Sequence, residues 1–224
     1  MYRVEDKYLC SERDMLLLQS RVKAVLPPDP HAAGASYRIT SLYFDDERDS
    51  RLADSEDGVS YRNKYRIRIY NNSADVIHLE VKYKAYSRIY KKSRAVTREE
   101  AEKLIAGECI DDPEPSLDNP VTLFILALRQ ELLRPRIVID YTRDAYIFTP
   151  GNVRITFDRN IRACRDPAGF LRGACAYSPL RDTDKILEVK YDEMLPGFIA
   201  RLLESGNMNQ IAYSKYRLAR EQLG

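Results

Sequence analysis

The sequence predicts an α+β fold built mainly of antiparallel strands, and three observations lead to that prediction. Several segments alternate apolar with charged residues, as strands with one apolar face do. The pentapeptide Leu-Glu-Val-Lys-Tyr occurs at 79–83 and again at 187–191, each time placing a carboxylate and an ammonium on one face. The segments between strands carry the capping and proline signals of short helices. Because the two copies lie too far apart for a solenoid repeat, they favour two related halves of one sheet.

Composition and charge limit the classes of function. The 224 residues are 44% hydrophobic, which is enough for a single domain over 1–224 with a buried core. The 36 Lys and Arg against 34 Asp and Glu leave a net charge of only +2, so any anion site must be local and no nucleic-acid partner is expected. No apolar run approaches the ~20 residues of a membrane span, and no signal peptide follows Met1. We therefore expect a cytoplasmic protein, which would need a membrane-protein partner to act at a membrane.

The first half of the chain is expected to form five strands and three short helices. The strands are predicted over 2–9, 37–45, 62–70, 76–84 and 87–96, with a turn at 71–73. The helices are predicted after Ser11, over 48–55, and from Thr97 toward Gly107. Ser11 with Asp14, and Thr97 with Glu100, have the spacing of a capping box.

The second half begins with an acidic, proline-broken loop over 111–120, which is interpreted as a connection because Asn119-Pro120 opens an apolar helix over 121–133. A hairpin is predicted from 135–148 and 152–163 around Pro150-Gly151. Residues 165–179 are expected to be irregular. The last elements are a strand over 185–191, a helix ending near 203 and a basic helix over 210–222. Asp182-Thr183-Asp184 has the look of a metal motif but is interpreted as turn chemistry.

Alternation alone leaves open which face of the strands is inside. An open sheet would expose its charged face to water and cover its apolar face with helices. A barrel would line a tunnel with the charges and carry the helices outside. Two features favour the barrel: the charged positions are arginines and lysines with few matching acids, and the strands are long.

Nine motifs carry a resemblance to a known family. In order they are Glu5-Asp6-Lys7-Tyr8, Ser41-Leu42-Tyr43-Phe44-Asp45, Arg66-Ile67-Arg68, Glu80-Val81-Lys82, Lys92-Ser93-Arg94, Tyr141-Thr142-Arg143, Val153-Arg154-Ile155, Leu187-Glu188-Val189-Lys190 and Ser214-Lys215-Tyr216. This series resembles the VTC domain, the polyphosphate polymerase branch of the triphosphate tunnel metalloenzymes. The resemblance implies an eight-stranded antiparallel barrel that encloses a basic tunnel and is covered outside by helices.

The same resemblance implies roles for ten residues. The catalytic set is Arg66, Arg68, Lys82, Arg154 and Glu188. The substrate-binding set adds Lys7, Lys92, Arg143, Lys190 and Lys215 to the four cations of the catalytic set. Glu188 would hold Mn²⁺ or Mg²⁺, together with oxygens of the substrate. These roles agree with the chemistry of the side chains, since guanidinium groups bind phosphate oxygens in pairs and lysines supply mobile charges.

Other charged residues have simpler interpretations. Glu80 could bind metal, but a structural ion pair with Lys82 is favoured. Arg62, Lys84 and Lys91 are expected to reach solvent at strand ends. The four cysteines and two histidines lack the spacing of a zinc site.

The function expected from this resemblance is metal-dependent transfer of the γ-phosphoryl group of ATP, or of another triphosphate, onto inorganic polyphosphate. A loose phosphoryl transition state needs mainly alignment and charge neutralisation, and a terminal phosphate oxygen needs no general base. Relatives that hydrolyse triphosphates carry two alternating glutamates before the first lysine, whereas only Glu5 precedes Lys7 here. Hydrolysis of triphosphate or short polyphosphate remains an alternative, as does a non-catalytic polyanion-binding module. RNA binding would require aromatic residues among the cations, and these are expected on the opposite face.

Overall fold

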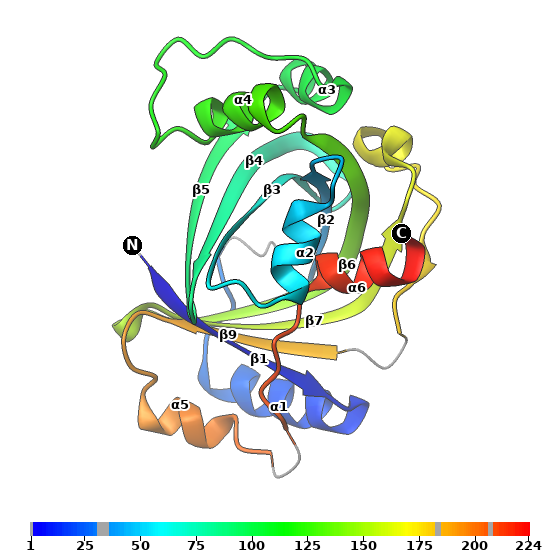
Figure 1. Ribbon diagram of the computed structural model, residues 1–224. Coiled ribbons are helices and arrows are strands. Elements are labelled where there is room, and N and C mark those ends of the chain that lie inside the picture. Colours follow the sequence, from blue (N-terminus) through cyan, green and yellow to red (C-terminus); the bar gives the residue numbers. More distant parts are fainter. Residues whose placement is uncertain (1, 31–35, 182–184, 206–207) are drawn as a thin grey trace.

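Eight antiparallel strands form a closed barrel in a computed structural model that describes residues 2–30, 36–181, 185–205 and 208–224 (Figure 1). Around the barrel the order is β6-β2-β3-β4-β5-β1-β9-β7, and pairing of β6 with β7 closes the ring. The strands are β1 (Arg3–Cys10), β2 (Tyr37–Asp45), β3 (Tyr61–Tyr70), β4 (Ser73–Ala85), β5 (Arg88–Val96), β6 (Arg134–Phe148), β7 (Val153–Cys164) and β9 (Lys185–Tyr191). The predicted barrel is confirmed, and Asp182-Thr183-Asp184 lies outside the described residues.

Short turns fix the register of neighbouring strands. Asn71 and Asn72 both have positive φ, as a tight hairpin turn between β3 and β4 requires. The turn between β4 and β5 consists of Tyr86 and Ser87, which places Lys82 opposite Lys91. A short 3-10 turn, η1 (Pro150–Asn152), joins β6 to β7 as expected. The interval over 165–179, expected to be irregular, contains η2 (Pro167–Arg172) and the short strand β8 (Ser178–Pro179), which pairs with β7.

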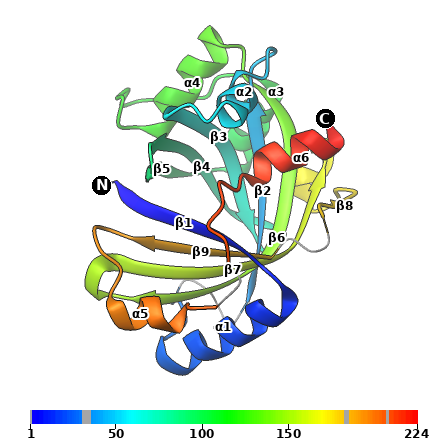
Figure 2. The same ribbon diagram turned by 60° about the horizontal axis from the view of Figure 1, so that its bottom comes forward.

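Two helical layers cover the outside of the barrel on opposite sides (Figures 1 and 2). On one side α3 (Arg98–Ala106) and α4 (Pro120–Gln130) cover β4 and β5, and the ring of Phe124 packs edge-on against Phe44 and Tyr65. On the other side α1 (Glu12–Val25) and α5 (Gly197–Leu202) cover β1, β9 and β7. The apolar residues of both pentapeptide copies face these layers, so their Glu and Lys residues face inward.

The helix starts follow the predicted signals. Ser11 and Thr97 each accept a hydrogen bond from the backbone N–H three residues on, and Thr97 forms a complete capping box with Glu100. Asn119 caps α4, whose first residue is Pro120. None of the described helices is both long enough and apolar enough to cross a membrane.

Two helices, α2 (Ser50–Glu56) and α6 (Lys215–Leu223), lie together at one side of the barrel opening (Figure 1). The phenol of Tyr216 donates a 2.6 Å hydrogen bond to Asp45, and Arg220 pairs with Asp49 at 2.8 Å. The prediction of a helix over 210–222 is wrong at its start. The backbone N–H of Ile211 bonds the carbonyl of Lys7 at 2.9 Å, which holds the preceding segment extended along β1.

Candidate active site

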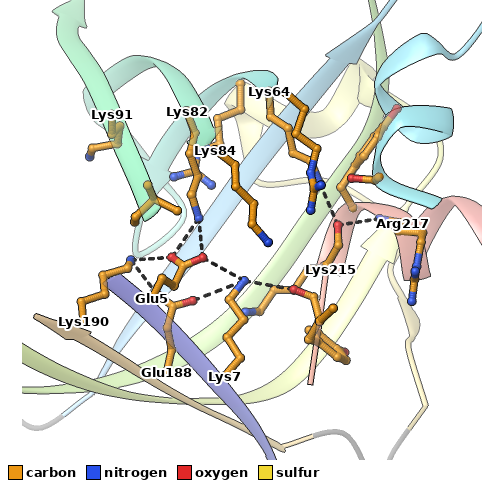
Figure 3. Close-up of a pocket in the computed structure, with 18 of the residues that line it drawn as sticks. Glu5, Lys7, Lys64, Lys82, Lys84, Lys91, Glu188, Lys190, Lys215 and Arg217 are labelled. Carbon is orange, nitrogen blue, oxygen red and sulfur yellow. Dashed lines mark hydrogen bonds and ion pairs between the residues drawn. The ribbon is translucent and has the colours of Figure 1, made fainter. Parts of the chain in front are cut away.

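The barrel encloses a cavity of about 880 Å³ whose lining is strongly basic (Figure 3). Among the described residues, three acidic side chains line it: Glu5, Glu56 and Glu188. Fourteen basic residues line it: Arg3, Lys7, Arg62, Lys64, Arg66, Arg68, Lys82, Lys84, Lys91, Arg143, Arg154, Lys190, Lys215 and Arg217. These cations come from seven of the eight barrel strands and from the C-terminal segment, so the cavity depends on closure of the barrel.

The cavity brings together nine of the ten residues predicted for the site and leaves out Lys92. Lys92 lies opposite Val81, on the outward face, and its ammonium contacts Asp118 at 3.0 Å. The expectation that Lys92 belongs to the same inward-facing set is therefore wrong, and its neighbour Lys91 lines the cavity instead. A two-residue turn at Tyr86 and Ser87 sets this alternation. Counting residues outward from the turn along both strands pairs Lys91 with Lys82 and would have identified Lys91.

On the wall formed by β1 and β9, acidic and basic side chains alternate across the strand pair. The antiparallel register places Lys7 opposite Glu188 and Glu5 opposite Lys190. The Lys190 ammonium lies 2.6 Å from Glu188 and 3.3 Å from Glu5, while Lys7 lies 3.3 Å from Glu5 and 3.7 Å from Glu188. Each lysine therefore touches both carboxylates, as Figure 3 shows.

This surrounding of lysines keeps both carboxylates ionised despite burial. Burial alone would raise the pKa of Glu188, but Lys190 and Lys7 hold it well below its usual range. Burial and Glu188 likewise oppose ionisation of Glu5, and lysines including Lys82 nevertheless hold its pKa low. Two ionised carboxylates side by side are a local concentration of negative charge inside a basic cavity.

Lys82 reaches this wall from β4. Its ammonium donates to both oxygens of Glu5, at 2.8 and 2.9 Å. Burial lowers the pKa of Lys82 to about 7, with Lys7 and Lys190 adding to the effect and Glu5 opposing it. A lysine with this pKa gives up or takes up a proton near neutral pH when the charge around it changes.

Another carboxylate, Glu80, also points into the barrel, but neighbouring cations cover it and it does not line the cavity. Its side chain is fully buried, and Arg66 and Lys91 contact it at 2.6 and 2.5 Å. Arg68 adds a longer contact at 3.7 Å. These cations hold the pKa of Glu80 well below its usual range, although burial alone would raise it. Glu80 is therefore held in ion pairs, but the expected partner Lys82 is wrong, because Lys82 contacts Glu5 instead.

Other predicted cations also form ion pairs with buried carboxylates. Arg143 binds Asp158 through two hydrogen bonds of 2.6 and 2.7 Å, and Lys215 contacts the same carboxylate at 2.6 Å. Arg154 contacts Asp29 at 2.8 Å. The expectation of few matching acids is therefore wrong in part, because several of the arginines form ion pairs with buried carboxylates.

Lys64 on β3 differs from these cations. Its ammonium donates to the hydroxyl of Ser214 at 2.8 Å and lies 5.3 Å from the ring centre of Tyr216. No carboxylate of the described residues lies within ion-pair distance of it. Burial, followed by the charges of Lys7 and Lys82, lowers the pKa of Lys64 well below its usual value.

The sequence interpretation left several lining residues out of the site. Lys64 shares a face with Arg66 and Arg68, so the alternation of β3 was the signal that could have found it. Arg62, Lys84 and Lys91, expected at solvent, are partly exposed but line the cavity. Tyrosines also line it, among them Tyr43 and Tyr141, contrary to the expectation that tyrosines pack on the outer face.

The residues present fit a hard divalent cation in one place. No group of three or more His, Cys, Asp or Glu suited to a metal occurs among the described residues. Glu5 and Glu188 nevertheless offer carboxylate oxygens side by side at the cavity wall, with Lys7 and Lys190 neutralising them. Mg²⁺ is commonly held by one or two carboxylates and by phosphate oxygens of the substrate, a donor set that this wall and a bound phosphate would supply.

Comparison with known proteins agrees with this fold. Similar solved structures include a candidate adenylyl cyclase from Hippeastrum described as having a dominant triphosphatase activity (TM-score 0.58, 12% identity, 99% of this chain and 95% of that chain). Others are the PH1819 protein from Pyrococcus horikoshii (0.51, 14%, 98% and 99%) and a candidate adenylate cyclase from Bacillus halodurans (0.50, 13%, 84% and 79%). A search of curated proteins finds no match. The VTC domain family matches residues 2–223, and the chain therefore belongs to the VTC domain family.

Proposed function

We propose that this protein is a metal-dependent transferase that moves the γ-phosphoryl group of ATP onto a growing inorganic polyphosphate chain inside the barrel. The observation that carries the proposal is the lining of the cavity, with fourteen basic and three acidic residues. A linear polyanion matches such a lining in charge and in shape. Membership of the VTC domain family supports the same substrate class.

The side chains supply what a loose phosphoryl transition state requires. Arg66, held by Glu80 and Tyr43, and Arg143, held by Asp158, present guanidinium groups of fixed orientation to phosphate oxygens. Lys82 can shift from Glu5 to an entering phosphate and become fully charged as it does so. The incoming phosphate oxygen is already anionic, so no general base is needed. A divalent ion at Glu188 and Glu5 would neutralise charge on the transferred group.

Hydrolysis of the triphosphate is a second candidate, favoured by the neighbouring carboxylates of Glu5 and Glu188. Such a pair can orient a water molecule as well as a metal ion. The structurally similar Hippeastrum protein is described as having a dominant triphosphatase activity. Transfer and hydrolysis differ only in the nucleophile, which is a phosphate oxygen in one and water in the other.

The experiment is to incubate the pure protein with γ-labelled ATP and Mn²⁺ and to resolve the products by length. Transfer predicts a ladder of labelled polyphosphates that a polyphosphatase removes. Label found only as orthophosphate would establish hydrolysis instead. If ATP remains intact while polyphosphate binds tightly, the protein is a non-catalytic polyanion-binding module.

A further inference from the structure

The cavity reaches the surface beside two exposed tyrosine rings. Binding and transfer of phosphate, as proposed above, do not use these rings. Tyr61 begins β3, and Tyr86 lies at the tip of the β4–β5 hairpin. They are 67% and 65% exposed, and their ring centres lie 5.3 Å apart with the planes at 74°. Tyr86 itself lines the cavity. Rings this exposed have apolar surface available to a ligand.

The backbone holds Tyr86 at this position at an energetic cost. Its φ is 53°, in the left-handed region that glycine or asparagine favours at a two-residue hairpin turn. The backbone N–H of Tyr86 bonds the carbonyl of Ser60 at 2.9 Å, which ties the tip to the start of β3. A bulky residue in a strained conformation at the entrance of a cavity indicates that the ring itself is needed there.

A second hollow of about 380 Å³ adjoins the cavity at this entrance, and Tyr61 lines it. The two spaces share Arg62 and Lys84. The second hollow also carries Asn63 and Asp54, whose side chains can donate or accept hydrogen bonds. Its volume lies within the range of small-molecule sites.

The cations at the entrance are placed between these rings and the inner cavity. Neither Arg62 nor Lys84 has a carboxylate within ion-pair distance among the described residues. Burial, followed by the charges of Arg62 and Lys7, lowers the pKa of Lys84. Lys82 and Lys84 are successive inward residues of β4, and Tyr86 follows them at the end of the strand. At about 3.3 Å per residue, Tyr86 lies roughly 13 Å from Lys82.

We propose that Tyr61 and Tyr86 bind the base of a nucleoside triphosphate, while its phosphates pass Arg62 and Lys84 into the cavity. The inference rests on the proposed function, which places a triphosphate among the inner cations. It adds where the base of that nucleotide is held, which is on two aromatic rings outside the phosphate-binding cavity. Because every base has a face that can stack on an aromatic ring, the site accepts ATP and GTP alike.

The test compares binding of ATP and of inorganic tripolyphosphate, each with Mg²⁺, at fixed ionic strength. The variants are Tyr61→Ala/Tyr86→Ala, Tyr86→Gly, and the matched control Tyr61→Phe/Tyr86→Phe, which keeps both rings. Tyr86→Gly suits the left-handed backbone, so its melting temperature should not fall. We expect the dissociation constant of ATP to rise about tenfold in the alanine variant and to rise in the glycine variant, and that of tripolyphosphate to stay within about twofold. The phenylalanine control should bind both ligands as the wild type does.

The two ligands separate this inference from the proposal beneath it. If tripolyphosphate binds and ATP affinity is the same in every variant, the rings take no base and the inference is wrong. If ATP and tripolyphosphate weaken in parallel, the rings shape the entrance, and base recognition is again excluded. If the wild type binds neither ligand, the proposed function fails, and this inference fails with it.

Discussion

The β1–β9 wall and the β3–β4 wall of the cavity use similar residues but balance their charges differently. On β1 and β9, Glu5 and Glu188 face the cavity, and lysines contact them at the surface of the lining. On β3 and β4, Glu80 is buried beneath Arg66 and its neighbouring cations, so Arg66 lines the cavity while its counter-charge does not. The first wall suits a cation bound together with phosphate, whereas the second suits phosphate alone. Substitutions on the two walls should therefore have different effects.

The largest expected effect is on metal-dependent activity. Glu188→Gln keeps the shape of the side chain but removes its charge, and we expect turnover with Mn²⁺ to fall at least about a hundredfold. Lys7 and Lys190 keep Glu5 as a partner, so the melting temperature should change little. Mn²⁺ binding, followed by electron paramagnetic resonance in the presence of tripolyphosphate, should weaken. Wild-type rates in this variant would remove Glu188 from the metal site.

The matched change on the other wall should affect stability instead. Glu80→Gln leaves Arg66, Arg68 and Lys91 without their shared buried carboxylate, and we expect a loss of about 3–5 kcal/mol in the free energy of unfolding. Urea denaturation of both Gln variants measures the contrast. Equal stability of the two would mean that the walls do not differ in the way proposed here.

Filling the cavity with an anion should stabilise the fold. Tripolyphosphate at about a hundred times its dissociation constant should add about 2.7 kcal/mol, which corresponds to a rise of roughly 5–10 °C in melting temperature. Chloride of equal ionic strength should raise it far less, because simple screening damps only exposed charges effectively. A variant lacking Arg66, Arg68 and Lys82 together should lose the difference between the two salts. Equal stabilisation of the wild type by both salts would contradict an inward-facing charged lining.

The smallest expected effect concerns the pH dependence that Lys64 imposes. A lysine whose pKa is lowered on folding destabilises the protein fully below the lowered pKa, and this penalty declines as pH rises from there to the ordinary lysine pKa, above which it is gone. Lys64→Met should therefore raise the melting temperature most at low pH, with the gain shrinking as pH rises toward 10.5, the ordinary lysine pKa. The same variant should bind tripolyphosphate more weakly. A gain that does not change with pH would indicate that Lys64 carries no penalty.

The local sequence determined the elements and the direction in which their side chains point. Strict alternation in the two Leu-Glu-Val-Lys-Tyr copies was enough to place Glu80 and Glu188 on the charged faces, because the side-chain period of a strand is two. Capping residues located the starts of the helices at Ser11, Thr97 and Asn119, because a cap side chain bonds a backbone N–H only two or three residues further along the chain. The family motifs then supplied the barrel, which alternation could not distinguish from an open sheet.

The tertiary structure decided which charges meet and which cations have no carboxylate partner among the described residues. Glu5 and Glu188 are far apart in the chain, and only the register of β1 with β9 brings both within reach of the same lysines. Glu80 and Glu188 occupy equivalent places in the repeated pentapeptide and both face inward, yet neighbouring cations cover the first while the second lines the cavity. In the described part of the chain Lys64 has no carboxylate within ion-pair distance, for a reason that no local pattern contains. The pKa of a buried group is set by the charges that the whole barrel places around it, and these come from strands distant in sequence.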